Sequence, residues 1–303
     1  MHRCWLILLI AWFTVISAAW AQGPASQKKP TVLTEEMSWT EIRDAINSGK
    51  STVLLVVASV EQHGPHLPTI TDTLVGKYVA QQAAMRLGNA LVAPVMQPGL
   101  AEHHLGFPGT ISLNFQDFTE VLTDYCVDLA QAGFKNIILI SAHGGNTDTM
   151  IAYAPRIAKQ LLNQADVYVA TGAVGPDEAR KREALAEKYH VSLGKVGVHA
   201  GWLETSMVLA IRPDLVDMSK AEEGLDQDSF YSPENVKRTQ LRGFAVGVKP
   251  YSSNGILGDP RGATAEAGRE LLDLEIDELV KTVHFLTEPN QPFSDHRAGG
   301  PGQ

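Results

Sequence analysis

Short apolar runs alternate with longer amphipathic stretches along most of this chain. The apolar runs have the length and composition of buried strands, and they cover Thr52–Ala58, Ala90–Val95, Asn136–Ile140 and Val167–Ala170. The amphipathic stretches predict helices over Asp72–Leu87, Phe115–Ala132, Thr147–Leu162, Asp177–Tyr189, Trp202–Ile211 and Ala263–Leu286. Gly88 and Gly133 are expected to end the first two helices. Because strands that are apolar on both faces need cover on both, the pattern predicts an α/β fold with a mostly parallel sheet between helices.

The first residues have the pattern of a secretory signal peptide. His2 and Arg3 precede an apolar stretch from Cys4 to Ile16, and Ala19-Trp20-Ala21 has the small-x-small form that signal peptidase accepts. A membrane anchor is the alternative, but the stretch is short for a span. We therefore expect export, to the periplasm or out of the cell. The expected organisation is a signal peptide at 1–21, a polar leader at 22–35, one domain at 36–287 and a flexible tail at 288–303.

Charge and cysteine content exclude several other classes of protein. The chain of 303 residues has a formal net charge of −9 and lacks basic clusters, which argues against binding to nucleic acids or anionic membranes. Of its two cysteines, Cys4 would leave with the signal peptide. Cys126 lies in a helical pattern and is expected to be buried, so no internal disulfide is expected.

Candidate chemistry begins directly after the first predicted strand. Glu61 and His63 are two residues apart in an extended segment, so their side chains point the same way. Asp72 would return to the same point from the first turn of the next helix. Oxygen and nitrogen ligands of this kind suit zinc, manganese or iron. Taken singly, His63 could be an ordinary hydrogen-bonded residue and Asp72 a helix cap.

Two further loops carry ligand-type residues to the edge where the strands end. His143 follows the strand Asn136–Ile140, and Asn146 is expected to cap the next helix. His199 precedes the helix Trp202–Ile211, which carries Glu204 in its first turn. Ligands of open α/β sheets bind beyond the carboxyl ends of the strands. The convergence of three such loops predicts at least one metal ion there.

Six motifs, in order from about Glu36 to Leu286, resemble the creatininase (creatinine amidohydrolase) family. They are Glu61-x-His63-Gly64 with Asp72 eleven residues after the glutamate, Phe107-Pro108-Gly109-Thr110-Ile111-Ser112-Leu113, His143-Gly144-Gly145-Asn146, His199-Ala200-Gly201 with Glu204-Thr205-Ser206, Arg212-Pro213-Asp214-Leu215-Val216, and Gly258-Asp259-Pro260 before Ala263-Thr264. The chain resembles a non-classical, exported member of this family. The resemblance implies a three-layer α/β/α fold and a centre of two divalent ions (zinc, manganese or both, with iron as an alternative) that hydrolyses amide-type C–N bonds.

The resemblance also implies which residues bind the two ions. Glu61 and His143 would hold one ion and His63 the other, with Asp72 as the bridge. Creatininase has a glutamate where this chain has Gly145, so creatinine itself is disfavoured as the substrate. Glu204 is the candidate for the missing ligand, and the alternative is a carboxylate that merely favours the start of its helix.

The expected mechanism is attack on an amide carbonyl by a hydroxide that bridges the two ions. His199, counted with Glu204 as catalytic, is the expected proton donor to the departing nitrogen. Contact with the small-molecule substrate is expected from His104, Gly145 and Trp202, although ordinary packing is equally open for Trp202. His103 is expected at the surface.

Other readings remain open at this point. Within enzymes, the family resemblance also admits a deformylase or a small peptidase. From a different class, an exported metal- or ligand-binding protein of the same fold could lack turnover. A homo-oligomer is expected, with a hexamer as the family's common form, and the irregular region Glu222–Ser253 could supply its contacts.

Overall fold

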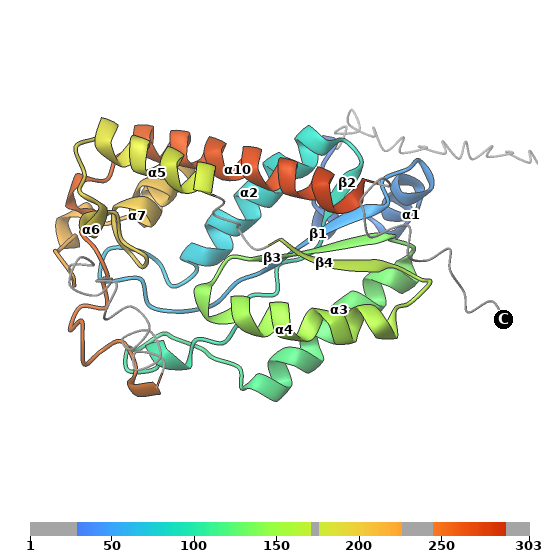
Figure 1. Cartoon of the computed structure of the whole chain (residues 1–303), viewed down its shortest axis with the longest axis horizontal. Coiled ribbons are helices and arrows are strands. Elements are labelled where there is room, and N and C mark those ends of the chain that lie inside the picture. The colour runs from blue at the N-terminus through green and yellow to red at the C-terminus, as the bar shows by residue number, and fades with distance from the viewer. Residues whose placement is uncertain (1–28, 171–175, 226–244, 289–303) are drawn as a thin grey trace, which may run out of the picture. The chain divides into compact units, whose positions relative to one another are not determined.

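The computed structural model of the chain describes residues 29–170, 176–225 and 245–288, and residues from Thr31 onward group into one compact unit (Figure 1). The expected signal peptide and the tail from 289 onward lie outside the described residues, as do residues 22–28 of the leader and the greater part of Glu222–Ser253. A search of the described residues finds no helix long and apolar enough to cross a membrane.

Among the described residues, four parallel strands form the sheet, in the order β2-β1-β3-β4. They are β1 (Thr52–Val57), β2 (Ala90–Val92), β3 (Asn136–Ser141) and β4 (Asp166–Ala170). The prediction of a mostly parallel sheet is confirmed. Strand β2 is shorter than expected because Pro94 has no N–H to donate to the ladder, although Met96 bridges again to Val57.

Helices cover both faces of this sheet, as the apolar strands require (Figure 1). One face carries α2 (Thr71–Leu87), α5 (Pro176–Lys188), α7 (Trp202–Ile211) and α10 (Ala265–Thr287). The other carries α3 (Phe115–Ala132) and α4 (Gly144–Gln160). Successive residues of β1 alternate between the two cores: Leu54 packs in the cluster of α2 and α10, and Leu55 in that of Phe118 on α3.

Several local details differ from the sequence-based expectation. Helix α1 (Trp39–Asn47) was not predicted, although Ser38 and Glu41 form a capping box at its start. Helix α4 begins at Gly144, so Asn146 lies inside its first turn and is not a cap. The remaining short elements are α6 (Leu193–Val196), η1 (Thr34–Glu36), η2 (Glu102–His104), η3 (Pro213–Leu215), η4 (Met218–Lys220) and η5 (Pro260–Gly262).

Candidate metal centre

A cluster of ligand-type side chains lies at the carboxyl edge of the sheet. Parallel strands all end at this edge, so the segments that follow β1 and β3 meet the first turns of α2 and α7 there. Each side chain of the cluster is buried except those of Glu204 and His103, which are partly exposed. The members are Glu61, His63, Asp72, His103, His104, His143, His199 and Glu204.

Two carboxylates stand between the imidazoles. Oδ1 of Asp72 lies 3.1 Å from Nε2 of His63, and its Oδ2 lies 3.5 Å from Nδ1 of His143. Oε1 of Glu61 lies 3.2 Å from the same Nδ1 of His143 and 3.5 Å from Nδ1 of His199. Asp72 therefore offers one oxygen to each of two histidines, which is the arrangement that a bridging ligand needs.

The far nitrogens of these rings face carbonyl oxygens, which can only accept hydrogen bonds. Nδ1 of His63 donates to the carbonyl oxygen of Glu61 over 3.2 Å, and Nε2 of His143 donates to that of Leu100 over 3.1 Å. A neutral imidazole carries one N–H, so in the neutral form of each ring, which is the form that binds metal, the nitrogen that faces the carboxylates carries a lone pair. Such outer hydrogen bonds are typical of histidines that bind metals.

With neutral rings, the imidazole nitrogens and the carboxylate oxygens are both acceptors, and this arrangement is stable only when a proton or a metal ion lies between them. Within the described part of the chain, Oε2 of Glu61 and Nε2 of His63 are buried and have no hydrogen-bond partner. Buried polar atoms without partners are costly and call for an explanation. Carboxylate oxygens and imidazole nitrogens are ligands of zinc and manganese, so the residues present fit a divalent ion.

The ionisation of the cluster shows the same preference for positive charge. Burial acts to lower the pKa of His63, but the charge of Asp72, with Glu204 and Glu61, outweighs it and raises that pKa to about 10. Burial is likewise outweighed at His143, where Glu61 and Asp72 raise the pKa well above 6.5. Protons occupy in this state the positions that a metal ion would take, because ligands must lose their protons to bind metal.

The position of Glu204 is compatible with both roles considered for it. Its Oε2 lies 3.7 Å from Nε2 of His63, which places it in the cluster. The same oxygen accepts a hydrogen bond from the backbone N–H of Ala200 over 2.5 Å, so it also satisfies a donor near the start of α7. Burial raises the pKa of Glu204 to about 7.

Gly145 leaves no room for a side chain. A Cβ atom there would lie 2.4 Å from the carbonyl oxygen of Leu100 and 2.5 Å from Nε2 of His143. No carboxylate can stand at this position without displacing the Leu100–His143 hydrogen bond. The expected contact between Gly145 and substrate stays a prediction.

Trp202 lies in the apolar core of the α2–α10 face. Its side chain is 1 % exposed, its indole N–H donates to the carbonyl oxygen of Gly262 over 3.1 Å, and its ring centre lies 5.9 Å from that of Tyr189. These contacts favour packing over the expected substrate contact.

Three other polar residues lie close to the centre: His66, His103 and Asn146. His66 is buried, and its Nε2 bonds the hydroxyl of Thr205 over 2.9 Å, which ties the loop after β1 to α7. The side chain of Asn146 bonds the carbonyl oxygen of Ala58 and the N–H of Leu100, so it joins two loops of the centre. The expectation of a surface position for His103 is wrong, because it is half-buried with its ring stacked on that of His143.

Two residues of the centre were not singled out from the sequence. Ser59 donates to Oδ2 of Asp72 over 2.7 Å, and Gln62 contacts both His104 and His199. Gln62 lies between Glu61 and His63 in the sequence. Alternation in an extended segment directs it away from them, so only its position within the motif could have drawn attention to it.

Known proteins resemble this chain over most of its length. The family described as Creatininase, creatinine amidohydrolase, matches residues 35–283. A mycofactocin precursor peptide peptidase of Mycolicibacterium smegmatis is 33 % identical over 224 residues, which are 72 % of this chain and 78 % of the relative. A creatinine amidohydrolase of Pseudomonas putida is 25 % identical over 260 residues, 84 % of this chain and 96 % of the relative.

Solved structures agree with the sequence relatives. Two structures of creatininase, one described as the manganese form and one as Zn-Zn type, each have a TM-score of 0.72 and 25 % identity. Each covers 86 % of this chain and 100 % of the neighbour. The expected fold, hydrolase class and family are thereby confirmed. This chain belongs to the creatininase family.

Proposed function

We propose that this protein is a metal-dependent amidohydrolase that cleaves the C–N bond of a small-molecule amide. The observation that carries the proposal is the buried set of imidazole lone pairs that face the oxygens of Glu61 and Asp72. Its membership of a family with named amidohydrolase and peptidase relatives supports the same reaction class.

The geometry supports a division of the centre between two ions. Glu61 and His143 would hold one ion, and His63 with Glu204 the other, with Asp72 shared between them. When bound, divalent ions of this kind supply a hydroxide near neutral pH and polarise a carbonyl oxygen. We propose zinc or manganese, the metals named for the solved neighbours.

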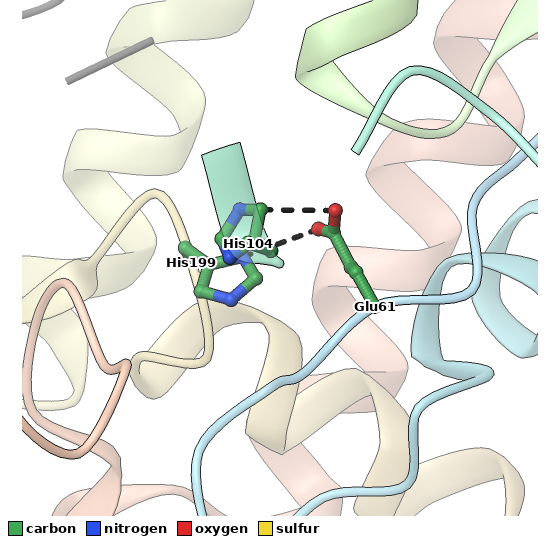
Figure 2. Close-up of side chains that lie close together, drawn as sticks. All are labelled: Glu61, His104 and His199. Atoms are coloured by element: carbon green, nitrogen blue, oxygen red, sulfur yellow. Dashed lines mark ion pairs between the residues drawn. The ribbon is translucent and has the colours of Figure 1, made fainter. Parts of the chain in front are cut away.

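The reaction also requires a proton for the departing nitrogen and a group that contacts the substrate. Hydrolysis breaks the C–N bond, so the carbonyl carbon gains the oxygen of water and the departing nitrogen must gain a proton. His104 is buried in the wall of the centre, with Nε2 3.7 Å from Oε2 of Glu61 (Figure 2). This position suits a group that contacts substrate, which is the role predicted for His104 from the sequence; the predicted proton donor was His199.

Two observations bear on the substrate. The steric limit at Gly145 excludes a carboxylate there, in contrast to creatininase, so we place creatinine outside the preferred substrates. A peptide amide is the second candidate, because a peptidase is 33 % identical to this chain.

Turnover of a substrate panel by metal-loaded protein tests the proposal. The panel comprises creatinine, other cyclic amides, N-formyl amines and short peptides, assayed with Zn²⁺ or Mn²⁺. We expect hydrolysis of at least one class, and a loss of about 100-fold or more in Asp72→Asn because the bridge is weakened. The exposed Asp124→Asn on α3 serves as the matched control and should keep full activity. A metal-loaded protein that binds panel members without turning any over would support the binding-protein alternative instead.

We also propose that the protein is exported and that it forms a homo-oligomer. The segment Glu222–Ser253 is the proposed source of contacts between its subunits. The signal-like pattern of residues 1–21 supports export, and N-terminal sequencing of protein recovered from the periplasm tests it. Sedimentation at micromolar concentration tests the oligomer, and a monomer alone would contradict it.

A further inference from the structure

Two histidines approach the carboxylate of Glu61 from loops that are far apart in the sequence. Nδ1 of His199 lies 3.5 Å from Oε1 of Glu61, and Nε2 of His104 lies 3.7 Å from its Oε2 (Figure 2). The two rings are neighbours, with centres 4.4 Å apart, and both are buried. Their chemistry toward the carboxylate depends on which ring nitrogen carries the proton.

The side-chain amide of Gln62 determines which ring nitrogen of His104 carries the proton. Oε1 of Gln62 accepts the backbone N–H of Gly64 over 2.9 Å, and because a backbone N–H can only donate, this contact fixes the orientation of the amide. Its Nε2 group then donates to Nδ1 of His104 over 2.9 Å and to the carbonyl oxygen of Gly255 over 3.1 Å. A ring that accepts at Nδ1 carries its proton on Nε2, so His104 presents an N–H to Glu61.

The main chain of Gln62 fixes the tautomer of His199, and here the nitrogen that faces Glu61 is the one without a proton. Nε2 of His199 lies 2.7 Å from the carbonyl oxygen of Gln62, which can only accept, so the proton of His199 is on Nε2. The amide nitrogen of Gln62 is also 2.9 Å from this atom, but its two hydrogens already serve His104 and Gly255. Nδ1 of His199 therefore presents a lone pair to the carboxylate of Glu61.

A lone pair that faces a carboxylate oxygen at 3.5 Å needs a cation beside it, whereas the N–H of His104 does not. His199 also lies near the second proposed ion position, because one of its ring nitrogens comes within 4.8 Å of a ligand atom of His63 and of one of Glu204. Its ring centre is 4.3 Å from that of His63. That position otherwise has His63, Glu204 and the shared Asp72.

We propose that His199 is a metal ligand, binding through Nδ1 the ion that His63 and Glu204 hold. This inference rests on the metal centre proposed above and changes the expected role of His199 from proton donor to ligand. Gln62 is a positioning residue, since its main-chain and side-chain groups set opposite tautomers in His199 and His104. His104, whose single proton is on Nε2, can donate a hydrogen bond to substrate from the wall of the centre.

Metal binding, read without turnover, tests the proposal. Protein stripped with a chelator is titrated with Zn²⁺ by competition against a chromogenic chelator and with Co²⁺ by its visible absorption. His199→Ala should lose at least about tenfold in affinity for one of the two ions and shift the Co²⁺ spectrum, because an imidazole nitrogen is replaced by water. Free imidazole should restore part of the lost affinity and part of the wild-type Co²⁺ spectrum.

Three other variants complete the test. His104→Ala and Gln62→Ala keep the contact of His199 with the main chain, so both should bind metal within about threefold of wild type while turnover falls. The exposed His284→Ala on α10 is the neutral control. Unchanged affinity and spectrum in His199→Ala, or an equal loss in His104→Ala, would overturn the assignment.

A variant that fails to fold and a wild type that binds metal without turnover have different consequences for the proposal. If His199→Ala does not fold, His199→Gln replaces it, and circular dichroism confirms its structure before the same titrations. Wild-type protein that binds two ions with His199 as a ligand, yet hydrolyses nothing in the substrate panel, would refute the proposed function and leave this inference standing.

Discussion

Ser59 donates a hydrogen bond of 2.7 Å to Oδ2 of Asp72 in the floor of the metal centre. Ser59 is fully buried just after β1, and Asp72 lies in the first turn of α2. The bond holds the carboxylate so that its other oxygen, Oδ1, faces His63 at 3.1 Å. One hydroxyl thus orients the carboxylate that we propose as the bridge between two ions.

Removal of this hydroxyl should weaken metal binding. We expect Ser59→Ala to lower the affinity for one or both ions by about 10-fold, the usual scale for outer hydrogen bonds to ligands. Chelator competition measures it. Ser51→Ala, at the opposite end of β1, is the matched control and should bind as wild type does. Equal affinities in the two variants would show that Asp72 does not depend on Ser59.

The neighbouring glycines of α4 should respond differently to alanine. In Gly145→Ala the new methyl group would meet Leu100 and His143 at 2.4–2.5 Å, so we expect a loss of about 1–3 kcal/mol in the free energy of unfolding. At Gly144 a Cβ meets nothing within 4 Å in the described structure, and alanine should be neutral or slightly stabilising. Urea unfolding compares the two. A Gly145→Ala variant as stable as Gly144→Ala would contradict the close packing seen here.

Asp259 should contribute stability that is lost in acid. Its carboxylate bonds the guanidinium of Arg261 at 2.8 Å and lies 3.4 Å from Nζ of Lys195, and the hydrogen bond from Arg261 is the main cause that lowers its pKa to about 2. A lowered pKa in the folded state means that the contribution is complete above about pH 4 and disappears as the pH falls toward 2. Because Arg261 is exposed, we expect only about 1 kcal/mol.

The pH dependence of Asp259→Asn isolates this contribution. The difference in unfolding free energy between wild type and the variant should be present at pH 6 and shrink as the pH is lowered from 4 to 2. A difference that stays constant across this range would show that the ion pair does not act through the ionisation of Asp259.

Cys126 should be inert in the folded protein. Its side chain is fully buried in the core beneath α3, and burial raises the pKa of the thiol to about 12. The thiolate is the reactive form, so Ellman's reagent should label Cys126 only after unfolding. A Cys4→Ser background removes the other thiol. Rapid labelling in native buffer would indicate that the α3 face opens readily.

Much of the framework followed from local pattern. The bounds of α3 and α7 match the expected helices, and Gly88 and Gly133 end α2 and α3 with φ angles of 75° and 112°. The period of the apolar residues indicates which face of a helix is buried, and a glycine after it indicates a left-handed residue at its end. Both signals depend only on residues that are close in the sequence. The same holds for β1, whose unbroken apolar run places Glu61 and His63 at the carboxyl edge of the sheet.

The tertiary structure alone decided how the loops share the centre. The amide of Gln62 meets the main chain at Gly255, 193 residues away, and Ser59 reaches Asp72 on another element. Trp202, next to a ligand motif, turned out to pack in the core. Such contacts depend on the packing of segments that are distant in sequence, and no local period encodes it. The sequence by itself determined which ligand-type residues follow the strands, and the folded chain decided which nitrogen of each histidine faces the carboxylates, because that choice depends on contacts between distant loops.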